Sequence, residues 1–182
     1  DAVYKPLNLP AVEDFAEDAV VPGTMGSSSM RRTGLYLEEV FRRNADNRNF
    51  RLMSPDETYS NKLDDVFKAV SRSWQWPIKP WDKDLSHDGR VMEMLSEHNM
   101  QGLMQGYVLT GRHAMFASYE AFLQIVSSMV DQYAKFLTQS RGVAWRGTIP
   151  SINYILTSSG WRQDHNGFSH QNPGFIDDLL RR

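Results

Sequence analysis

The chain has 182 residues, a length typical of one domain, and its 20 basic and 22 acidic side chains give a net charge of −2. This balance leaves no surplus of positive charge, which argues against nucleic acid as the main partner. Cysteine is absent, which excludes disulfides, thiolate metal sites and a cysteine nucleophile. The apolar runs are far shorter than the roughly 18 residues that a membrane-spanning helix needs.

The first half of the chain predicts an arm followed by helices and a strand. Residues 1–30 are rich in Pro, Gly and Ser and indicate an N-terminal arm and linker, ahead of a domain at residues 31–182. Apolar side chains at helical spacing predict a helix over residues 31–45. A short apolar run predicts a strand over residues 49–54, which a proline ends. Residues 60–63 can open a further helix.

Predicted helices and strands also alternate in the second half of the chain. Residues 72–90 lack a period and indicate a long, exposed excursion, whereas apolar periodicity predicts helices over about residues 90–107 and 117–138. A β-branched run predicts a buried strand over residues 152–157, and a polar, glycine-rich loop follows at residues 158–175. Alternating strands and helices predict an α/β fold, an open and mostly parallel sheet with helices on both faces. In such sheets ligands bind outside the carboxyl ends of the strands.

One acidic residue interrupts the apolar helix expected over residues 90–107. Glu97 lies between Leu95 and Met100. A carboxyl group buried among such side chains could share a proton with a nitrogen heterocycle. The alternative is an exposed helical glutamate with no chemical role, and the residues alone leave both interpretations open.

Hydrogen-bonding side chains are concentrated in the segment 161–174. Two of the five histidines, His165 and His170, lie in it, together with Gln163 and Asn166. This composition favours an active-site loop in which imidazoles transfer protons and amides bind the hydroxyl groups of a polyol. A zinc site and a plain solvated loop are the alternatives, and no third histidine has a suitable spacing for zinc.

Three aromatic residues recur every third position near the start of the helix expected over residues 117–138. Phe116, Tyr119 and Phe122 should therefore lie near one face of that helix. Core packing is the ordinary interpretation of such a stripe, and a platform for a flat heterocycle is the functional one.

Several longer motifs point to one family. They are Pro-Asp-Glu-Thr-x-Ser-Asn-x-Leu (55–63), Leu-Ser-Glu-His (95–98), Gly-Tyr-x-Leu-Thr-Gly-Arg-His (106–113), Tyr-Glu-Ala-Phe (119–122) and Trp-Arg-Gln-Asp-His-Asn-Gly-Phe-Ser-His-Gln-x-Pro-Gly-Phe-Ile-Asp (161–177). With these motifs the chain resembles, over about residues 31–178, the central pyrimidine-binding domain of D-xylulose 5-phosphate/D-fructose 6-phosphate phosphoketolases. The departures from the family pattern are mild: Met53-Ser54, Ala114 and Asn172.

The resemblance implies a fold of the thiamine diphosphate-binding, pyrimidine-domain type and a cytoplasmic lyase that works as a homodimer or a larger oligomer. The implied reaction cleaves xylulose 5-phosphate, fructose 6-phosphate or both with inorganic phosphate, and gives acetyl phosphate and an aldose phosphate. The implied cofactors are thiamine diphosphate and Mg2+.

The resemblance also assigns roles to single residues. Glu97 is implied to hydrogen-bond the aminopyrimidine ring and so to be both catalytic and cofactor-binding. The other implied cofactor residues are Ser60, Tyr119 and Phe122. The implied substrate residues are Tyr119, Gln163, His165, Asn166 and His170, and both histidines are also implied to be catalytic. Arg112 and Arg162 either meet a phosphate or have a structural role.

The chain lacks the Gly-Asp-Gly run with which the resemblance implies that the metal and the diphosphate are held. We therefore expect the metal ligands, the remaining domains and the adjacent subunit's diphosphate-binding domain to lie outside this chain, which would be inactive as an isolated fragment. Two alternatives remain. One is a ketol transferase of the transketolase type, and the other is a dimerisation domain without catalytic function.

Overall fold

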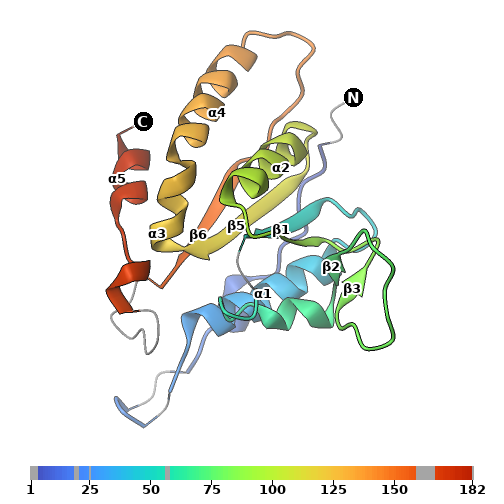
Figure 1. Cartoon of the computed structure of the whole chain (residues 1–182), viewed down its shortest axis with the longest axis vertical. Helices are drawn as coiled ribbons and strands as arrows, with labels where there is room; N and C mark the ends of the chain where they lie inside the picture. Colours follow the sequence, from blue (N-terminus) through green and yellow to red (C-terminus); the bar gives the residue numbers. More distant parts are fainter. Residues whose placement is uncertain (1–3, 19–20, 25, 56–57, 159–166, 182) are drawn as a thin grey trace.

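Six strands form one sheet in the order β3-β2-β4-β1-β5-β6, and every neighbouring pair is parallel. The computed structural model describes residues 4–18, 21–24, 26–55, 58–158 and 167–181 (Figure 1). The strands are β1 (Phe50–Ser54), β2 (Arg72–Ser73), β3 (Leu85–Ser86), β4 (Val91–Glu93), β5 (His113–Tyr119) and β6 (Ile152–Thr157). The predicted α/β class is therefore confirmed.

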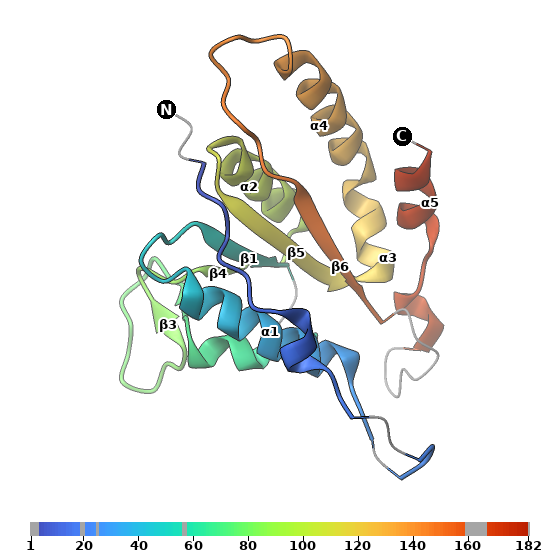
Figure 2. The same cartoon turned by 180° about the vertical axis from the view of Figure 1, so that it is seen from behind.

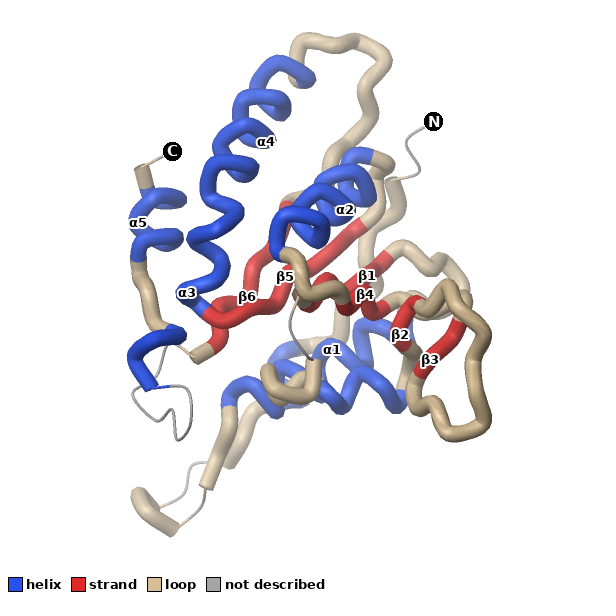
Figure 3. The backbone as a smooth tube through the Cα atoms, viewed as in Figure 1, coloured by secondary structure: helices blue, strands red, loops and turns tan. Residues whose placement is uncertain are grey.

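Helices cover both faces of this sheet (Figures 2 and 3). The α-helices are α1 (Ser29–Arg43), α2 (Glu97–Leu109), α3 (Glu120–Leu123), α4 (Ser127–Ser140) and α5 (Gly174–Leu180). The 3-10 helices are η1 (Val12–Phe15), η2 (Asp64–Lys68), η3 (Gln124–Val126) and η4 (Gly167–His170). Helices α1 and η2 pack on one face, whereas α2, α4 and α5 pack on the other.

The central strand β1 is buried on both faces. Leu52 contributes to the core under α1, where Val40 and Phe41 pack. Its neighbour Met53 contributes to the opposite core, together with Met104 of α2. Successive side chains of a strand point to opposite faces, so an uninterrupted apolar run is what a strand between two helical layers requires.

The chain leaves β1 and β4 toward opposite faces of the sheet. The connection after β1 enters η2 on the α1 face, and the connection after β4 enters α2 on the other face. Because β1 and β4 are neighbours, their carboxyl ends form a topological switch point, which is where ligands bind in open α/β sheets. The residues that follow β1 and β4 are therefore the first candidates for a site.

The helix predicted over residues 90–107 is wrong at its start. Val91–Glu93 form β4, which pairs with β1 from Leu52 to Ser54, and α2 begins only at Glu97. The side-chain oxygen of Ser96 accepts a hydrogen bond from the backbone N–H of Asn99 and so caps the helix. Three strand residues are too few to show a period of two, so the helical pattern of α2 was extended backwards over them.

The helix predicted over residues 117–138 also begins too early. Strand β5 runs to Tyr119, and the helical part is divided into α3, η3 and α4. Phe116 and Tyr119 consequently lie on a strand and not on a helix face with Phe122, which belongs to α3. Buried strand and buried helix residues are equally apolar, so the period alone did not separate them.

Two shorter segments also differ from the expectation. The helix expected to open at residues 60–63 is the 3-10 helix η2, which starts at Asp64. The excursion at residues 72–90 contains the two short strands β2 and β3, although Trp76 and Trp81 within it are exposed. Among the described residues no helix is long and apolar enough to cross a membrane.

The described part of the N-terminal arm lies against the domain. The carbonyl oxygen of Lys5 accepts hydrogen bonds from Nε2 of His113 and Nδ2 of Asn49. Further along, the ring of Phe15 meets the ring of Tyr36 edge-on.

Candidate functional site

Glu97 lies at the switch point, as the first residue of α2 and four residues after the end of β4. Its side chain is partly exposed, and it has no hydrogen bond or ion pair with any residue that the structure describes. The expectation that Leu and Met side chains enclose it does not hold within this chain, because Leu95 precedes the helix and is 85% exposed. Glu97 is therefore a half-buried carboxylate at a ligand-binding position of the fold.

The loop after β1 leaves the sheet beside β4, on the other side of the switch point from α2, and is held by polar contacts. The backbone N–H of Thr58 donates a hydrogen bond to Oε1 of Glu93, the last residue of β4, at 2.9 Å. Farther along the loop, Oδ1 of Asn61 accepts a hydrogen bond from Oγ1 of Thr157, at the end of β6. Ser60, one of the predicted cofactor residues, lies half-buried between these two attachments.

Aromatic rings gather at the end of β5. The ring centroids of Tyr119 and Phe122 are 5.8 Å apart, and the imidazole of His170 meets both rings edge-on, at 5.1 and 5.2 Å. Oγ of Ser169 lies 2.9 Å from Nδ1 of His170 and helps to orient that ring. Three residues predicted from two separate motifs are thus neighbours, since η4 packs against α3.

Hydrogen bonds of two acidic side chains hold the segment that carries His170 in place. Glu120 at the start of α3 is buried, and its Oε2 accepts a hydrogen bond from the backbone N–H of Asn172 at 3.0 Å. In α5, Oδ2 of Asp178 accepts hydrogen bonds from Nε2 of Gln124 and Oγ of Ser127. These contacts hold the end of the polar segment 158–175 against α3 and α4.

Several predicted residues lie outside the described residues: Gln163, His165, Asn166 and Arg162. The other arginine, Arg112, immediately precedes β5 and is thus at the amino ends of the strands, away from Glu97. Its Nη1 donates to Oγ1 of Thr110, and its guanidinium carbon is 5.8 Å from the ring centroid of Tyr107. This position favours the structural interpretation of Arg112.

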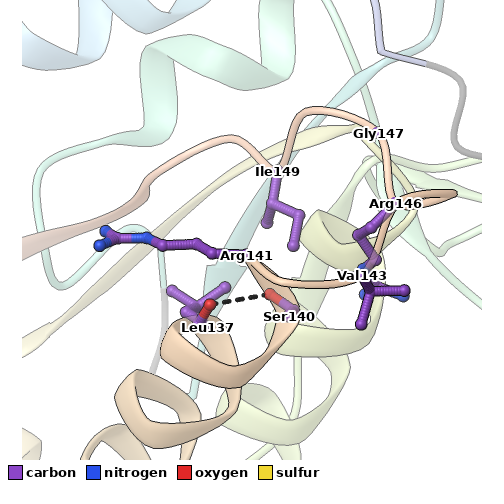
Figure 4. Close-up of a pocket in the computed structure, with 7 residues that line it drawn as sticks. All are labelled: Leu137, Ser140, Arg141, Val143, Arg146, Gly147 and Ile149. Atoms are coloured by element: carbon purple, nitrogen blue, oxygen red, sulfur yellow. Dashed lines mark hydrogen bonds between the residues drawn. The ribbon is translucent and has the colours of Figure 1, made fainter.

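A pocket of about 230 Å3 lies elsewhere, between the end of α4 and the loop that leads to β6 (Figure 4). It is lined by Leu137, Ser140, Arg141, Val143, Arg146, Gly147 and Ile149. Figure 4 shows the guanidinium group of Arg141 directed away from Arg146. The pocket is at the amino end of β6, its lining includes no carboxylate or imidazole, and the hydroxyl of Ser140 donates to the carbonyl oxygen of Leu137, so it is not our candidate.

Sequence reasoning missed the polar residues that build the switch point. The apolar pattern predicts a helix at Glu93, whereas this acid, directly after Val91 and Met92, is the last residue of the short strand β4. The hydroxyls of Thr58 and Ser118 were also missed, and both are buried near the carboxyl ends of the strands with no hydrogen-bond partner among the described residues.

Comparisons with known proteins show which family the chain resembles. The sequence profile described as "D-xylulose 5-phosphate/D-fructose 6-phosphate phosphoketolase" matches residues 31–182. The chain is 54% identical, over 95% of its length, to a probable phosphoketolase of Bradyrhizobium diazoefficiens, and 53% identical, over 99%, to one of Nitrosospira multiformis. It spans 22% of the length of each of these two relatives. The chain belongs to the phosphoketolase family.

Proposed function

We propose that this chain supplies the pyrimidine-side half of the active site of a phosphoketolase that depends on thiamine diphosphate. The enzyme would cleave xylulose 5-phosphate, fructose 6-phosphate or both with inorganic phosphate, and release acetyl phosphate and an aldose phosphate. The observation that carries this proposal is the position of Glu97, a half-buried carboxylate without a described partner, at the switch point of a parallel sheet.

The residues present fit the pyrimidine half of this cofactor. A carboxyl group can hydrogen-bond the ring nitrogen of an aminopyrimidine, and Glu97 has this group available. The rings of Tyr119 and Phe122, two strands away from β4, would pack against the flat heterocycle. Ser60, on the loop between Thr58 and Asn61, would complete the contacts from the other side of the switch point.

The diphosphate and its Mg2+ would be held by another part of the enzyme. No cluster of three or more His, Asp or Glu side chains that could hold a metal occurs in the part of the chain that the structure describes. Met94 and Leu95, just before Glu97, are 44% and 85% exposed. Apolar side chains at this position support a site that a neighbouring domain completes, in a homodimer or a larger assembly.

The chemistry that thiamine diphosphate supplies when bound is a carbon nucleophile that allows the bond next to a ketose carbonyl to be cleaved. Glu97 would share a proton with the pyrimidine nitrogen through a carboxylate oxygen. His170 and His165 would exchange protons with the sugar hydroxyl groups. The amides of Gln163 and Asn166 would orient the same hydroxyl groups by directional hydrogen bonds.

The decisive experiment replaces the carboxyl group in the full-length enzyme. Glu97→Gln keeps the size of the side chain but cannot exchange the proton, so we expect the rate of acetyl phosphate formation to fall by roughly 10^3-fold or more. The matched control is Glu39→Gln on α1, whose only described partner is Arg43 at the surface. We expect that variant to keep the wild-type rate.

Two other results would contradict the proposal. Unchanged turnover of Glu97→Gln would favour a dimerisation domain without catalytic function. Transfer of a ketol group to an aldose, with no acetyl phosphate formed, would favour the transketolase-type reaction. We also expect the 182-residue chain alone to show no turnover, since half of the site would be missing, and acetyl phosphate from the purified chain would oppose this.

A further inference from the structure

Glu93, the last residue of β4, contacts both the loop after β1 and the neighbouring strand β2. Its Oε1 accepts the hydrogen bond from the backbone N–H of Thr58, in the loop after β1. Its Oε2 accepts a hydrogen bond from Nε of Arg72, in β2, at 2.5 Å. The side chains of Glu93 and Arg72 are only 20% and 17% exposed, so solvent screens this ion pair weakly.

Contacts with an aromatic ring and a second carboxylate also fix the side chain of Arg72. Its guanidinium carbon lies 4.0 Å from the ring centroid of Phe67, a cation–π contact. A second carboxylate, that of Asp84, is 3.7 Å from Nη1 of Arg72 and accepts a hydrogen bond from the hydroxyl of Tyr59. Desolvation, together with this hydrogen bond, raises the pKa of Tyr59. Arg72 therefore presents a rigid, charged surface to Glu93.

The loop that Glu93 holds leaves the sheet next to β4, after which Glu97 begins α2. Thr58 is attached to Glu93, and Asn61 is attached to Thr157 of β6. Ser60 lies between the two attachment points. Glu97 follows Glu93 by four residues in the chain. The positions of the loop after β1 and of the start of α2 therefore both depend on the position of Glu93 at the end of β4.

We propose that Glu93 is a positioning residue for the cofactor site, because it sets the distance between the loop after β1 and the start of α2. This inference rests on the proposed function. Loss of the carboxylate would leave the backbone N–H of Thr58 without its acceptor and Arg72 without its principal counter-charge. The loop that carries Ser60 would then move relative to Glu97, and the cofactor would bind more weakly.

The test compares two substitutions in the full-length apoenzyme. Glu93→Ala removes both contacts, whereas Glu93→Gln keeps an oxygen for the N–H of Thr58 and loses the charge that faces Arg72. The dissociation constant of thiamine diphosphate, in the presence of Mg2+, is measured by quenching of tryptophan fluorescence. We expect an increase of about 10- to 100-fold for Glu93→Ala and a smaller increase for Glu93→Gln.

The matched control is Asp84→Asn, which also weakens a contact to Arg72 but does not touch Thr58. Asp84 has a positive φ of 56°, and asparagine tolerates this conformation. We expect its dissociation constant to stay within about twofold of the wild-type value, even if its melting temperature falls. The near-ultraviolet circular dichroism of the bound cofactor should change in both Glu93 variants and not in the control.

A dissociation constant for Glu93→Ala within twofold of the wild type would overturn the proposal. An equal weakening in Asp84→Asn would also overturn it, because the effect would then follow general stability. If Glu93→Ala fails to fold, the Glu93→Gln variant decides, and wild-type affinity in that variant counts against the proposal. These outcomes would contradict only the role of Glu93 and would not change the result expected for Glu97→Gln. A wild-type apoenzyme that binds no thiamine diphosphate would overturn both proposals.

Discussion

Oε2 of Glu120 accepts a hydrogen bond from the backbone N–H of Asn172, although the two residues are 52 positions apart in the sequence. Glu120 is 7% exposed, and it begins the short helix that follows Tyr119. The contact fastens the segment that carries His170 directly beside the aromatic rings at the end of β5.

From the proposed function we predict that Glu120→Ala in the full-length enzyme raises the KM for the ketose phosphate by about tenfold, because the imidazole of His170 loses its fixed position. Glu120→Gln retains a side-chain oxygen that can accept from Asn172, so its KM should stay near the wild-type value. Steady-state kinetics at saturating phosphate measure both. Equal KM values for the two variants would show that the contact does not position His170.

The backbone at Gly89 approaches β2 too closely for any side chain. A Cβ atom at position 89 would lie 2.1 Å from the carbonyl oxygen of Arg72. We predict that Gly89→Ala lowers the free energy of unfolding by roughly 3 kcal/mol or more, since the pairing of β2 must shift. Urea denaturation of the chain measures this.

The control for that substitution is Gly106→Ala in α2. A Cβ atom at position 106 would meet nothing within 4 Å. Alanine in a helix interior is more favourable than glycine, so we expect a gain of roughly 0.5–1 kcal/mol. A loss of similar size in both variants would contradict the steric argument for Gly89.

The contact between Tyr119 and His170 should be measurable as a coupling energy. Edge-on aromatic pairs contribute about 0.5–1.5 kcal/mol beyond the area that they bury. We predict a coupling of this size from a double-mutant cycle of Tyr119→Leu and His170→Leu, with unfolding followed by urea denaturation. The reference cycle combines Tyr119→Leu with a substitution of the exposed residue His98, and its coupling should be near zero.

Ionisation of Tyr133 should make the folded chain less stable at alkaline pH. Burial raises the pKa of Tyr133 to about 12, and its hydroxyl has no hydrogen-bond partner among the described residues. The unfolded chain loses this proton near pH 10, about two pH units before the folded chain does. Stability is therefore fully present below about pH 10 and falls as the pH rises toward 12, by about 3 kcal/mol at most.

Urea denaturation at pH 8 and pH 12 tests this, with Tyr133→Phe as the comparison. The wild type should lose more stability than the variant between the two values, because phenylalanine has no proton to lose. An identical loss in both proteins would show that Tyr133 is not responsible.

Long or strongly patterned elements were predictable from the sequence. The helix expected at residues 31–45 is α1, and the strands expected at residues 49–54 and 152–157 are β1 and β6. Strand β4 was not predictable, because three residues are too few to show a period. The change from strand to helix at Tyr119 was not predictable for another reason: burial continues from β5 into α3, and Glu120 at the start of α3 is itself buried.

The site was predictable only where its residues lie within a continuous motif. Glu97, Tyr119, Phe122 and His170 were named from such motifs, and the structure brings the last three together. The network of Glu93 was not predictable. Its partners lie 21 and 35 positions away, and no local pattern indicates that they meet.

Strand β6 lies at one end of the sheet and, in contrast to the two-residue β3 at the other end, has six residues. Its residues from Ile152 to Thr157 include no charged side chain. An uncharged outer strand of this length presents a row of backbone amides and carbonyls to which other polypeptides can pair. We therefore expect the 182-residue chain, produced by itself, to self-associate at high concentration. Light scattering would detect this, and a lysine at position 153 should reduce it.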